Sequence, residues 1–168
     1  AKGREIIDAY LDEARIVGWE PGPEHLLITF HTCIAETDEA AIEALKGGVN
    51  YFNSTLMNVQ RNAQQIVLQK TKFYQSEKNR DFFVERLKKA KSRTIEEAIQ
   101  EGTVLCGKPE TVVKQIKRAQ AELGVGWINT NMKIGNIPNE VVTKGMELFR
   151  YFVGPEVRGI EKTPEPVM

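Results

Sequence analysis

The sequence has little that would direct the chain to a charged partner or a membrane. Its 168 residues include 23 Lys plus Arg and 23 Asp plus Glu, so the formal net charge is zero. Binding to nucleic acid or an anionic membrane through bulk charge is therefore disfavoured. No apolar run approaches the roughly 20 residues that cross a bilayer, and no apolar signal region follows the first residues. We predict a cytoplasmic protein with no nucleic-acid partner and no membrane partner.

Cysteine is scarce as well, since the chain holds just Cys33 and Cys106. The two lie far apart, each within a predicted strand, and no secretory signal points to an oxidising compartment. We therefore expect two buried, reduced thiols and no metal site.

What the sequence does contain is the composition of a folded domain, with 41% hydrophobic and 27% charged residues. One stretch predicts a strand, a turn and a helix. Residues 103–106 are largely apolar, Gly107 permits a tight turn, and Pro109 suits a first helical turn. Apolar residues then recur at helical spacing up to Gly124, and a strand pattern follows. This order predicts two parallel strands joined by a helical crossover.

The same alternation runs through most of the chain. We predict strands at residues 25–35, 103–106 and 127–132, and helices at residues 4–17, 37–48, 94–101, 109–123 and 139–153. Residues 49–93 carry scattered aromatic residues in polar, helical sequence, which predicts a helical insertion that includes a lid or a dimer contact. We expect residues 1–155 to form one unit and residues 156–168 a loosely ordered tail.

Local signals place the predicted helix ends and the faces of the first strand. The expected caps are Thr37, Thr94 paired with Glu97, and Asn139, and the expected stops are Gly18, Gly47-Gly48, Gly102, Gly124 and Gly154-Pro155. Near-continuous apolarity in residues 25–35 indicates a parallel strand covered on both faces. Thr29, His31 and Cys33 nevertheless alternate on one side of it, which a purely structural strand does not require.

Three parallel strands alone would leave long apolar edges unpaired, whereas eight such units close a barrel without edges. The simplest interpretation is a barrel whose first part precedes Ala1.

Three pieces of the sequence resemble the luciferase-like family of flavin-dependent monooxygenases. Residues 30–41 (FHTCIAETDEAA) are similar to the family's sixth strand and following helix start, and residues 104–116 to its seventh unit. Residues 123–128, 135–140 and 146–150 are similar to its eighth strand, loop and closing helix. Lys108 departs from the family, which usually has Ser or Thr at that position. Thr29 departs from the sulfonate-type members, some of which have Arg there. The resemblance implies an α/β fold: the C-terminal part, about strands 6 to 8 with helices, of a (β/α)8 TIM barrel with a helical insertion.

The resemblance also implies an activity and a site. Reduced flavin, FMN or alternatively a deazaflavin, would activate dioxygen to oxidise a small organic substrate, with electrons from NAD(P)H or a flavin reductase. His31 is the expected catalytic residue, Thr29, Gly107 and Lys108 the expected cofactor contacts, and Asn129, Asn131 and Lys133 the expected substrate contacts. The expected partners are the N-terminal part of the same barrel, a flavin reductase and further copies of the chain.

Plainer interpretations stay open for the same residues. His31 is equally explained as a buried, hydrogen-bonded core residue, Asn129 and Asn131 as polar groups that bond neighbouring strands, and the lysines as solvated side chains. The chain as a whole could be a non-catalytic flavin-binding or structural relative that completes a partner's barrel. A third alternative is a complete α/β binding domain that folds alone.

Overall fold

Three parallel strands form the centre of the computed structural model, which describes residues 2–57, 70–72, 76–77 and 94–158. They are β1 (Leu27–Ile34), β2 (Val104–Gly107) and β3 (Trp127–Asn131). The sheet order is β2-β1-β3, and both neighbours run parallel to β1. His31 pairs with Val104 on one side and with Asn131 on the other. The predicted α/β class and the three predicted strands are confirmed.

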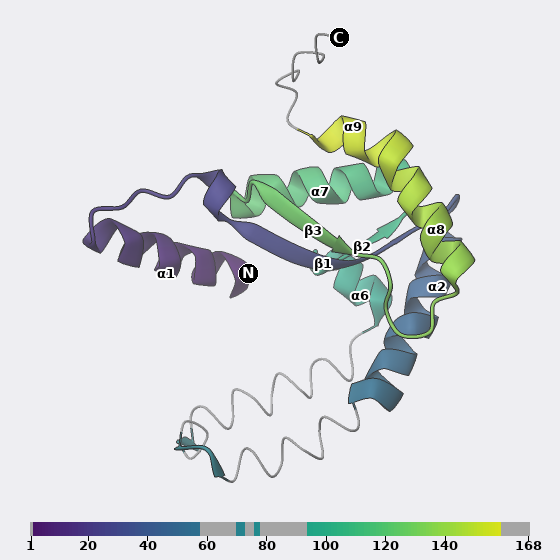
Figure 1. Cartoon of the computed structure of the whole chain (residues 1–168), viewed down its shortest axis with the longest axis horizontal. Coiled ribbons are helices and arrows are strands. Elements are labelled where there is room, and N and C mark those ends of the chain that lie inside the picture. Colours follow the sequence, from purple (N-terminus) through teal and green to yellow (C-terminus); the bar gives the residue numbers. More distant parts are fainter. Residues whose placement is uncertain (1, 58–69, 73–75, 78–93, 159–168) are drawn as a thin grey trace, which may run out of the picture.

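Helices occupy the connections between the strands (Figure 1). In chain order they are α1 (Lys2–Ile16), η1 (Pro23–His25), α2 (Asp38–Tyr51), the π-helical η2 (Phe52–Leu56), α6 (Ile95–Gln100), α7 (Pro109–Leu123), α8 (Asn139–Leu148), the π-helical η3 (Phe149–Val153) and α9 (Gly154–Val157). Most of the predicted insertion and of the predicted tail lies outside the described residues. Each helix that the structure describes is too short or too polar to cross a bilayer.

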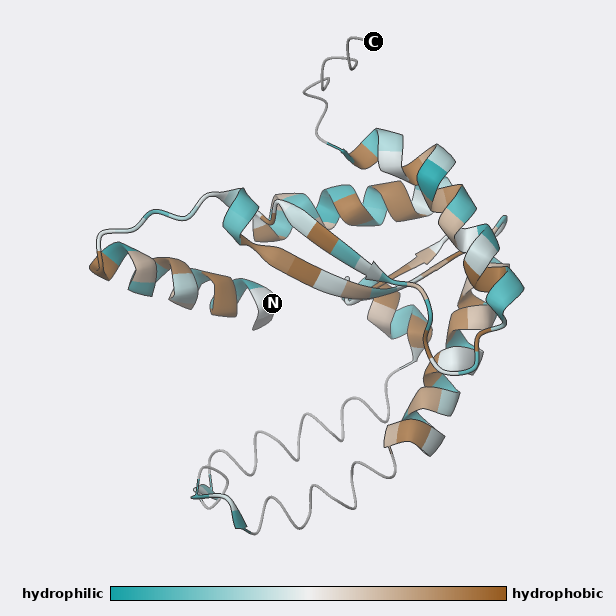
Figure 2. Ribbon diagram, in the orientation of Figure 1, coloured by the Kyte–Doolittle hydropathy of each residue, from teal (hydrophilic) through white to brown (hydrophobic). Residues whose placement is uncertain are grey.

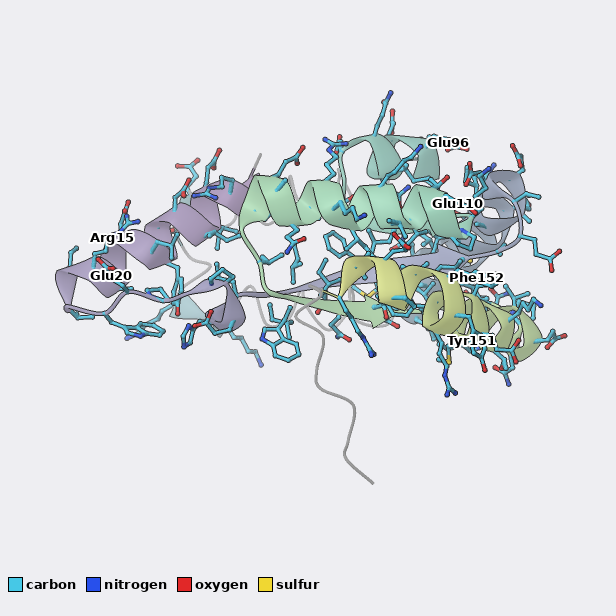
Figure 3. All side chains as sticks on the ribbon, turned by 90° about the horizontal axis from the view of Figure 1, so that it is seen from above. Arg15, Glu20, Glu96, Glu110, Tyr151 and Phe152 are labelled. Carbon is cyan, nitrogen blue, oxygen red and sulfur yellow. The ribbon has the colours of Figure 1, made fainter. Side chains whose placement is uncertain are left out.

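One face of β1 is covered by helices, and Figure 3 shows α7 lying on one side of the strands. Side chains alternate between the two faces of a strand, so the even-numbered residues of β1 share one face. Phe30 and Ile34 on this face are each 2% exposed. Ile28 and Phe30 line a hollow with residues of α7, and Thr32 and Ile34 line another with residues of α8. Figure 2 shows hydrophobic bands along α7 and on β1 and β2, as packing between them requires.

The opposite face is buried at one end only. Cys33 and Cys106 are 5% and 2% exposed, whereas Leu27 and Trp127, at the other end, are 64% and 60% exposed. Thr29, between them, is also exposed. The prediction that this strand is covered on both faces is therefore wrong for its first half.

The strand order differs from that of consecutive barrel units, which would place β2 between β1 and β3. At the outer edge of β2, the Gln115 side chain takes the position of a neighbouring strand. Its Oε1 accepts a hydrogen bond from the Cys106 N–H at 2.8 Å, and its Nε2 donates one to the Cys106 carbonyl at 2.9 Å. Gln115 thus satisfies this backbone pair at the outer edge of β2, while β3 pairs with the other side of β1. The described residues thus form an open sheet.

Several predicted helix ends are confirmed. Thr37 Oγ1 accepts a hydrogen bond from the Ala40 N–H at 3.2 Å at the start of α2. Thr94 and Glu97 form a reciprocal capping box at the start of α6. Gly124 ends α7 in the left-handed conformation, with φ +69°.

Three predicted helix ends are wrong. The cap of α8 is Pro138, and Asn139 is the first helical residue. Helix α2 continues past Gly48 to Tyr51, and Gly48 is buried where a Cβ would lie 2.5 Å from Ile137 Cγ1. Close packing therefore requires the glycine. Helical backbone also continues through Gly154-Pro155, since Pro155 falls in the first turn of α9, where no N–H is needed.

A loop after β3 crosses α2 at very short range. Gly135 in this loop has φ +56°, and a Cβ on it would overlap the carbonyl oxygen of Gly48. On either side of the crossing, Leu45 is fully buried and Ile137 is 2% exposed. Two glycines facing each other thus allow the loop to lie on the helix backbone.

Candidate functional site

The uncovered half of the sheet forms a small polar and aromatic surface, which we call the open strand face. It consists of Leu27, Thr29, His31, Trp127, Asn129 and Asn131. The register pairs Leu27 with Trp127, Thr29 with Asn129, and His31 with Asn131. Four of the seven residues predicted to form a site therefore lie together as two cross-strand pairs, although they come from strands one hundred positions apart.

Thr29 and Asn129 make a weak contact in the middle of this face. Asn129 Nδ2 donates a hydrogen bond to Thr29 Oγ1 at 3.4 Å, well beyond the usual N–H···O distance of about 2.9 to 3.0 Å. Both residues are exposed. A ligand on this face would therefore contact the Thr29 hydroxyl and the Asn129 amide, which bind each other only weakly.

His31 marks the border between the open and the buried part of the face. The residue is half-buried, its ring lies 6.3 Å from the Phe52 ring at a 57° tilt, and its Nδ1 atom is buried without a hydrogen-bond partner among the described residues. Burial lowers the pKa of the imidazole, because desolvation disfavours the charged form. The interpretation of His31 as a hydrogen-bonded core residue does not fit this buried, unpaired Nδ1. Its imidazole can donate through one nitrogen and accept through the other.

The lowered pKa of His31 predicts a loss of stability in mild acid. The unfolded chain binds a proton near the ordinary histidine pKa of about 6.5, whereas the folded chain binds it at lower pH. The free energy of unfolding should therefore begin to fall as the pH drops below about 6.5 and go on falling until His31 in the folded chain is also protonated. Urea titrations at pH 7.5 and 5.5 measure this. In His31→Gln the fall should shrink, and an unchanged fall would assign the effect to other groups.

Gly107 and Lys108 lie on the side of β1 that faces away from β3. Gly107 is the last residue of β2 and pairs with Ile34 of β1. The Lys108 N–H at the start of α7 donates a 2.7 Å hydrogen bond to Asp38 Oδ1, and Thr111 Oγ1 donates one to Asp38 Oδ2 at 3.2 Å. Gly107 has φ +144°, and a Cβ there would lie 2.5 Å from Asp38 Oδ1. The carboxylate of Asp38 thus already occupies this helix N-terminus. A cofactor role for Gly107 and Lys108 stays a prediction, and this arrangement disfavours an anion there.

Lys133 follows β3 and is exposed, and its Nζ donates a hydrogen bond to the Ile137 carbonyl. The contact holds the loop after β3 together. The role of Lys133 as a substrate contact also stays a prediction.

The two cysteines lie opposite each other in the register of β1 and β2. Both are free and buried. Burial raises the pKa of Cys33 to about 11, and burial, with a smaller contribution from Cys33, raises that of Cys106 to about 12. The thiols therefore stay protonated near neutral pH, where a thiol is a poor nucleophile. They contribute to the core, as predicted.

The hollow that Ile28 and Phe30 line has a volume of about 250 Å³ and lies between α1, α6 and α7. Two polar side chains that line it, Gln115 and Arg118, are already bonded. Gln115 binds Cys106, and Arg118 binds the Glu122 carboxylate at 2.7 Å and the Gln100 carbonyl at 3.1 Å. Because these groups have partners, the open strand face is the better candidate for a site with polar recognition.

Sequence reasoning missed three residues that shape the site. Asp38 lies at the start of the predicted helix 37–48, and nothing in its spacing points to the N-terminus of α7. Phe52 lies beside the His31 ring, although no strand pattern connects them. Trp127 was expected as an ordinary strand residue, and its pairing with the exposed Leu27 depends on the strand order.

The fold defines a class: a parallel α/β structure in which helices connect all three strands. No protein-family model matches the sequence, and the comparison with curated proteins gives no match. Two bacterial enzymes have similar structures. The monooxygenase RslO1 from Streptomyces bottropensis superposes on 91% of this chain with a TM-score of 0.57 at 19% identity. The oxygenating constituent of 3,6-diketocamphane monooxygenase from Pseudomonas putida, a type II Baeyer–Villiger monooxygenase in complex with FMN, superposes on 91% with a TM-score of 0.59 at 16% identity.

The chain spans less than two-fifths of these similar structures, 37% of the first and 39% of the second. At such identities the likeness concerns the fold alone. The described chain therefore has the fold of a part of these larger monooxygenases.

Proposed function

We propose that this chain is part of a flavin-dependent monooxygenase of the luciferase-like type, which uses reduced flavin and dioxygen to oxidise a small organic substrate. The observation that carries the proposal is the open strand face, where His31 holds an unpaired buried nitrogen beside three further polar side chains. The fold supports it, because the chain superposes on two monooxygenases over 91% of its length. The proposal includes a placement as about strands 6 to 8 of a TIM barrel, in which the pair of β1 and β2 would be kept and β3 would pair with β2 in place of β1.

The residues present fit a flavin ring or a substrate beside it. A flavin offers carbonyl oxygens and ring nitrogens, and the face offers the amides of Asn129 and Asn131 and an imidazole with one nitrogen unpaired. We propose FMN as the cofactor, with a deazaflavin as the alternative, and FMN is the cofactor bound in the similar P. putida structure. When bound and reduced, it would supply the electrons that activate dioxygen.

Each side chain of the face has a proposed task. His31, neutral near pH 7, donates a hydrogen bond from one ring nitrogen to the reacting oxygen or holds the substrate in place. Asn129 and Asn131 bind the substrate through their amides, and Thr29 lines the same wall. Phe52 shields the His31 ring from water, which strengthens any hydrogen bond that the ring makes.

The proposed partner is the remaining part of the barrel, in the same polypeptide or in a separate one, together with further copies of the chain and a flavin reductase. The bare half of the sheet supports this proposal, because exposed Leu27 and Trp127 would be covered in a closed barrel. The unpaired outer edge of β3 would also gain a neighbour.

Replacement of the two histidines tests the function. The protein is purified together with any chains that bind it. Its oxygen consumption is then measured with NADH, FMN and an added flavin reductase. In His31→Ala we expect turnover to fall about 10²- to 10⁴-fold, because a positioned general acid or hydrogen-bond donor contributes on that order. His25→Ala is the matched control, since His25 lies in η1, accepts a bond from the Gly22 N–H and contacts Trp19. It should keep its turnover.

Unchanged turnover in His31→Ala would remove His31 from the proposed role. Flavin absorbance without oxygen consumption in the unmodified protein would favour the alternative of a non-catalytic flavin-binding or structural relative.

A further inference from the structure

The first half of β1 has no strand beside it on the side where β2 lies. β2 begins at Val104, which pairs with His31, whereas β3 accompanies β1 from Leu27 onwards. The residues of β1 before His31 therefore form an open edge on this side. Backbone N–H and C=O groups at such an edge lack the hydrogen bonds that a neighbouring strand supplies.

Two hydrogen bonds show which residues of β1 point their backbone groups at this edge. In a strand, the N–H and C=O of one residue point to the same side, and those of the next residue point to the other side. On the β3 side, the Leu26 carbonyl accepts a bond from the Trp127 N–H. On the β2 side, the Ala35 N–H donates one to the Gly107 carbonyl. Odd-numbered residues of β1, including Thr29, therefore point their backbone groups toward β2.

The backbone of Thr29 has no hydrogen-bond partner on this side among the described residues. Thr103, which precedes β2, turns away from Thr29, because its N–H and its hydroxyl both bond the Ala98 carbonyl, at 2.9 Å and 3.1 Å. Thr29 also lines the hollow of about 250 Å³ between α1, α6 and α7. Since its side chain bonds Asn129 on the open strand face, Thr29 meets this hollow through its backbone.

The walls of the hollow are mainly apolar. They include Ile28, Phe30, Ile99, Leu105, Ala119 and Leu123. The polar side chains Gln115 and Arg118 are bonded within the protein. A cavity of about 150 Å³ with an apolar lining is large enough to bind benzene. The hollow beside Thr29 thus has room for a ring that carries a substituent.

The edge of β2 shows which substituent would suit Thr29. There, the Gln115 carboxamide accepts a hydrogen bond from the Cys106 N–H and donates one to the Cys106 carbonyl. A single amide group thus replaces a neighbouring strand. Thr29 presents the same two backbone groups at the edge of β1, where it faces the hollow.

We propose that this hollow is a binding site for a small, uncharged molecule that carries a primary carboxamide on an apolar body. The carboxamide oxygen accepts a hydrogen bond from the Thr29 N–H, and its nitrogen donates one to the Thr29 carbonyl. The body packs against Phe30 and Leu105. The site lies on the helix-covered face of the sheet, so the proposal goes beyond the proposed function and does not depend on it. The pair of β1 and β2 that bounds the hollow is kept in the proposed barrel.

Two small molecules of nearly the same shape test the site. Benzamide carries an NH₂ donor where acetophenone carries a methyl group. Each is titrated by calorimetry into the protein, purified with any chains that bind it and labelled with ¹⁵N at threonine. We expect benzamide to bind at least about 10-fold more tightly, because acetophenone leaves the Thr29 carbonyl unpaired. Benzamide should also shift the NMR signal of the Thr29 N–H.

Substitutions in the wall of the hollow and on the opposite face locate the ligand. Ala119→Leu places a larger side chain in the hollow and should abolish binding of both compounds. Ala121→Leu is the matched control, because Ala121 lies on the same helix α7 but is exposed, and it should bind as the unmodified protein does. Thr29→Val removes the hydroxyl on the open strand face but keeps the backbone groups, so its affinity for benzamide should be unchanged.

Equal affinities for the two compounds, or no binding of benzamide, would overturn the proposal. So would a loss of benzamide binding in Thr29→Val, which would place the ligand on the open strand face. Circular dichroism shows whether Ala119→Leu folds, and if it does not, the two compounds and Thr29→Val still decide. Oxygen consumption is not measured in these experiments, so this site and the proposed function can each fail while the other stands.

Discussion

Gly135→Ala should destabilise the protein by about 3 to 5 kcal/mol, and lower the melting temperature by on the order of 10 °C. Two costs add at this position. The left-handed φ of +56° is unfavourable for alanine, and the added Cβ would overlap the Gly48 carbonyl oxygen. Because the obstacle is backbone of α2 and cannot rotate away, the loop after β3 must move off the helix. Urea denaturation followed by circular dichroism measures the loss.

Gly102→Ala separates the two costs. Gly102 has a similar φ of +65°, but nothing lies within 4 Å of its Cβ position. This control should lose about 1 to 2 kcal/mol, the conformational cost alone. Equal losses in the two variants would show that the crossing of Gly135 over α2 has room for a methyl group.

Asp38→Ala should cost about 2 to 3 kcal/mol, the second largest effect that we expect. The carboxylate accepts hydrogen bonds from the Lys108 N–H and the Thr111 hydroxyl, which lie 70 and 73 positions further along the chain. It also places a negative charge at the N-terminus of α7, where the helix dipole favours one. Removal leaves the first turn of α7 without its cap, since Lys108 supplies no side-chain hydrogen bond. Urea denaturation again gives the loss.

Glu39→Ala is the matched control, because Glu39 carries the same charge in the same first turn of α2 and is exposed. We expect it to lose less than about 0.5 kcal/mol. Asp38→Asn keeps acceptor capacity without the charge and should lose about 1 kcal/mol. A loss in Glu39→Ala as large as in Asp38→Ala would place the effect in α2 itself.

The secondary structure could be predicted because local signals determine most of it. Thr94 and Glu97 make a capping box wherever their spacing occurs at a helix start, and Gly124 ends a helix through its own backbone freedom. Gly48 shows the limit of such signals. A glycine that ends a helix and one that permits close packing look alike in the sequence, and the contact with Ile137 decides between them.

Long-range arrangement was the harder part. Nothing in the local sequence predicts that the Gln115 side chain binds the outer edge of β2, or that β1 is the central strand. The exposure of Leu27 and Trp127 follows from that order, so an apolar run alone suggested burial on both faces. Part of the site was nevertheless within reach. Alternation placed Thr29 with His31 and Asn129 with Asn131, and parallel register brought the two pairs together. Asp38 was out of reach, because its partners lie 70 and 73 positions away.

The central place of β1 has a consequence for synthesis. Of the three described strands, β1 is the first that a ribosome completes, yet its partners begin at Val104 and Trp127, and the contact between Thr29 and Asn129 spans one hundred positions. At about 5 to 20 residues per second, β1 waits for its last partner for about 5 to 20 seconds. During that time an apolar strand with two unpaired edges is open to aggregation with neighbouring chains. We therefore expect the yield of folded protein to depend on chaperones that shield this segment.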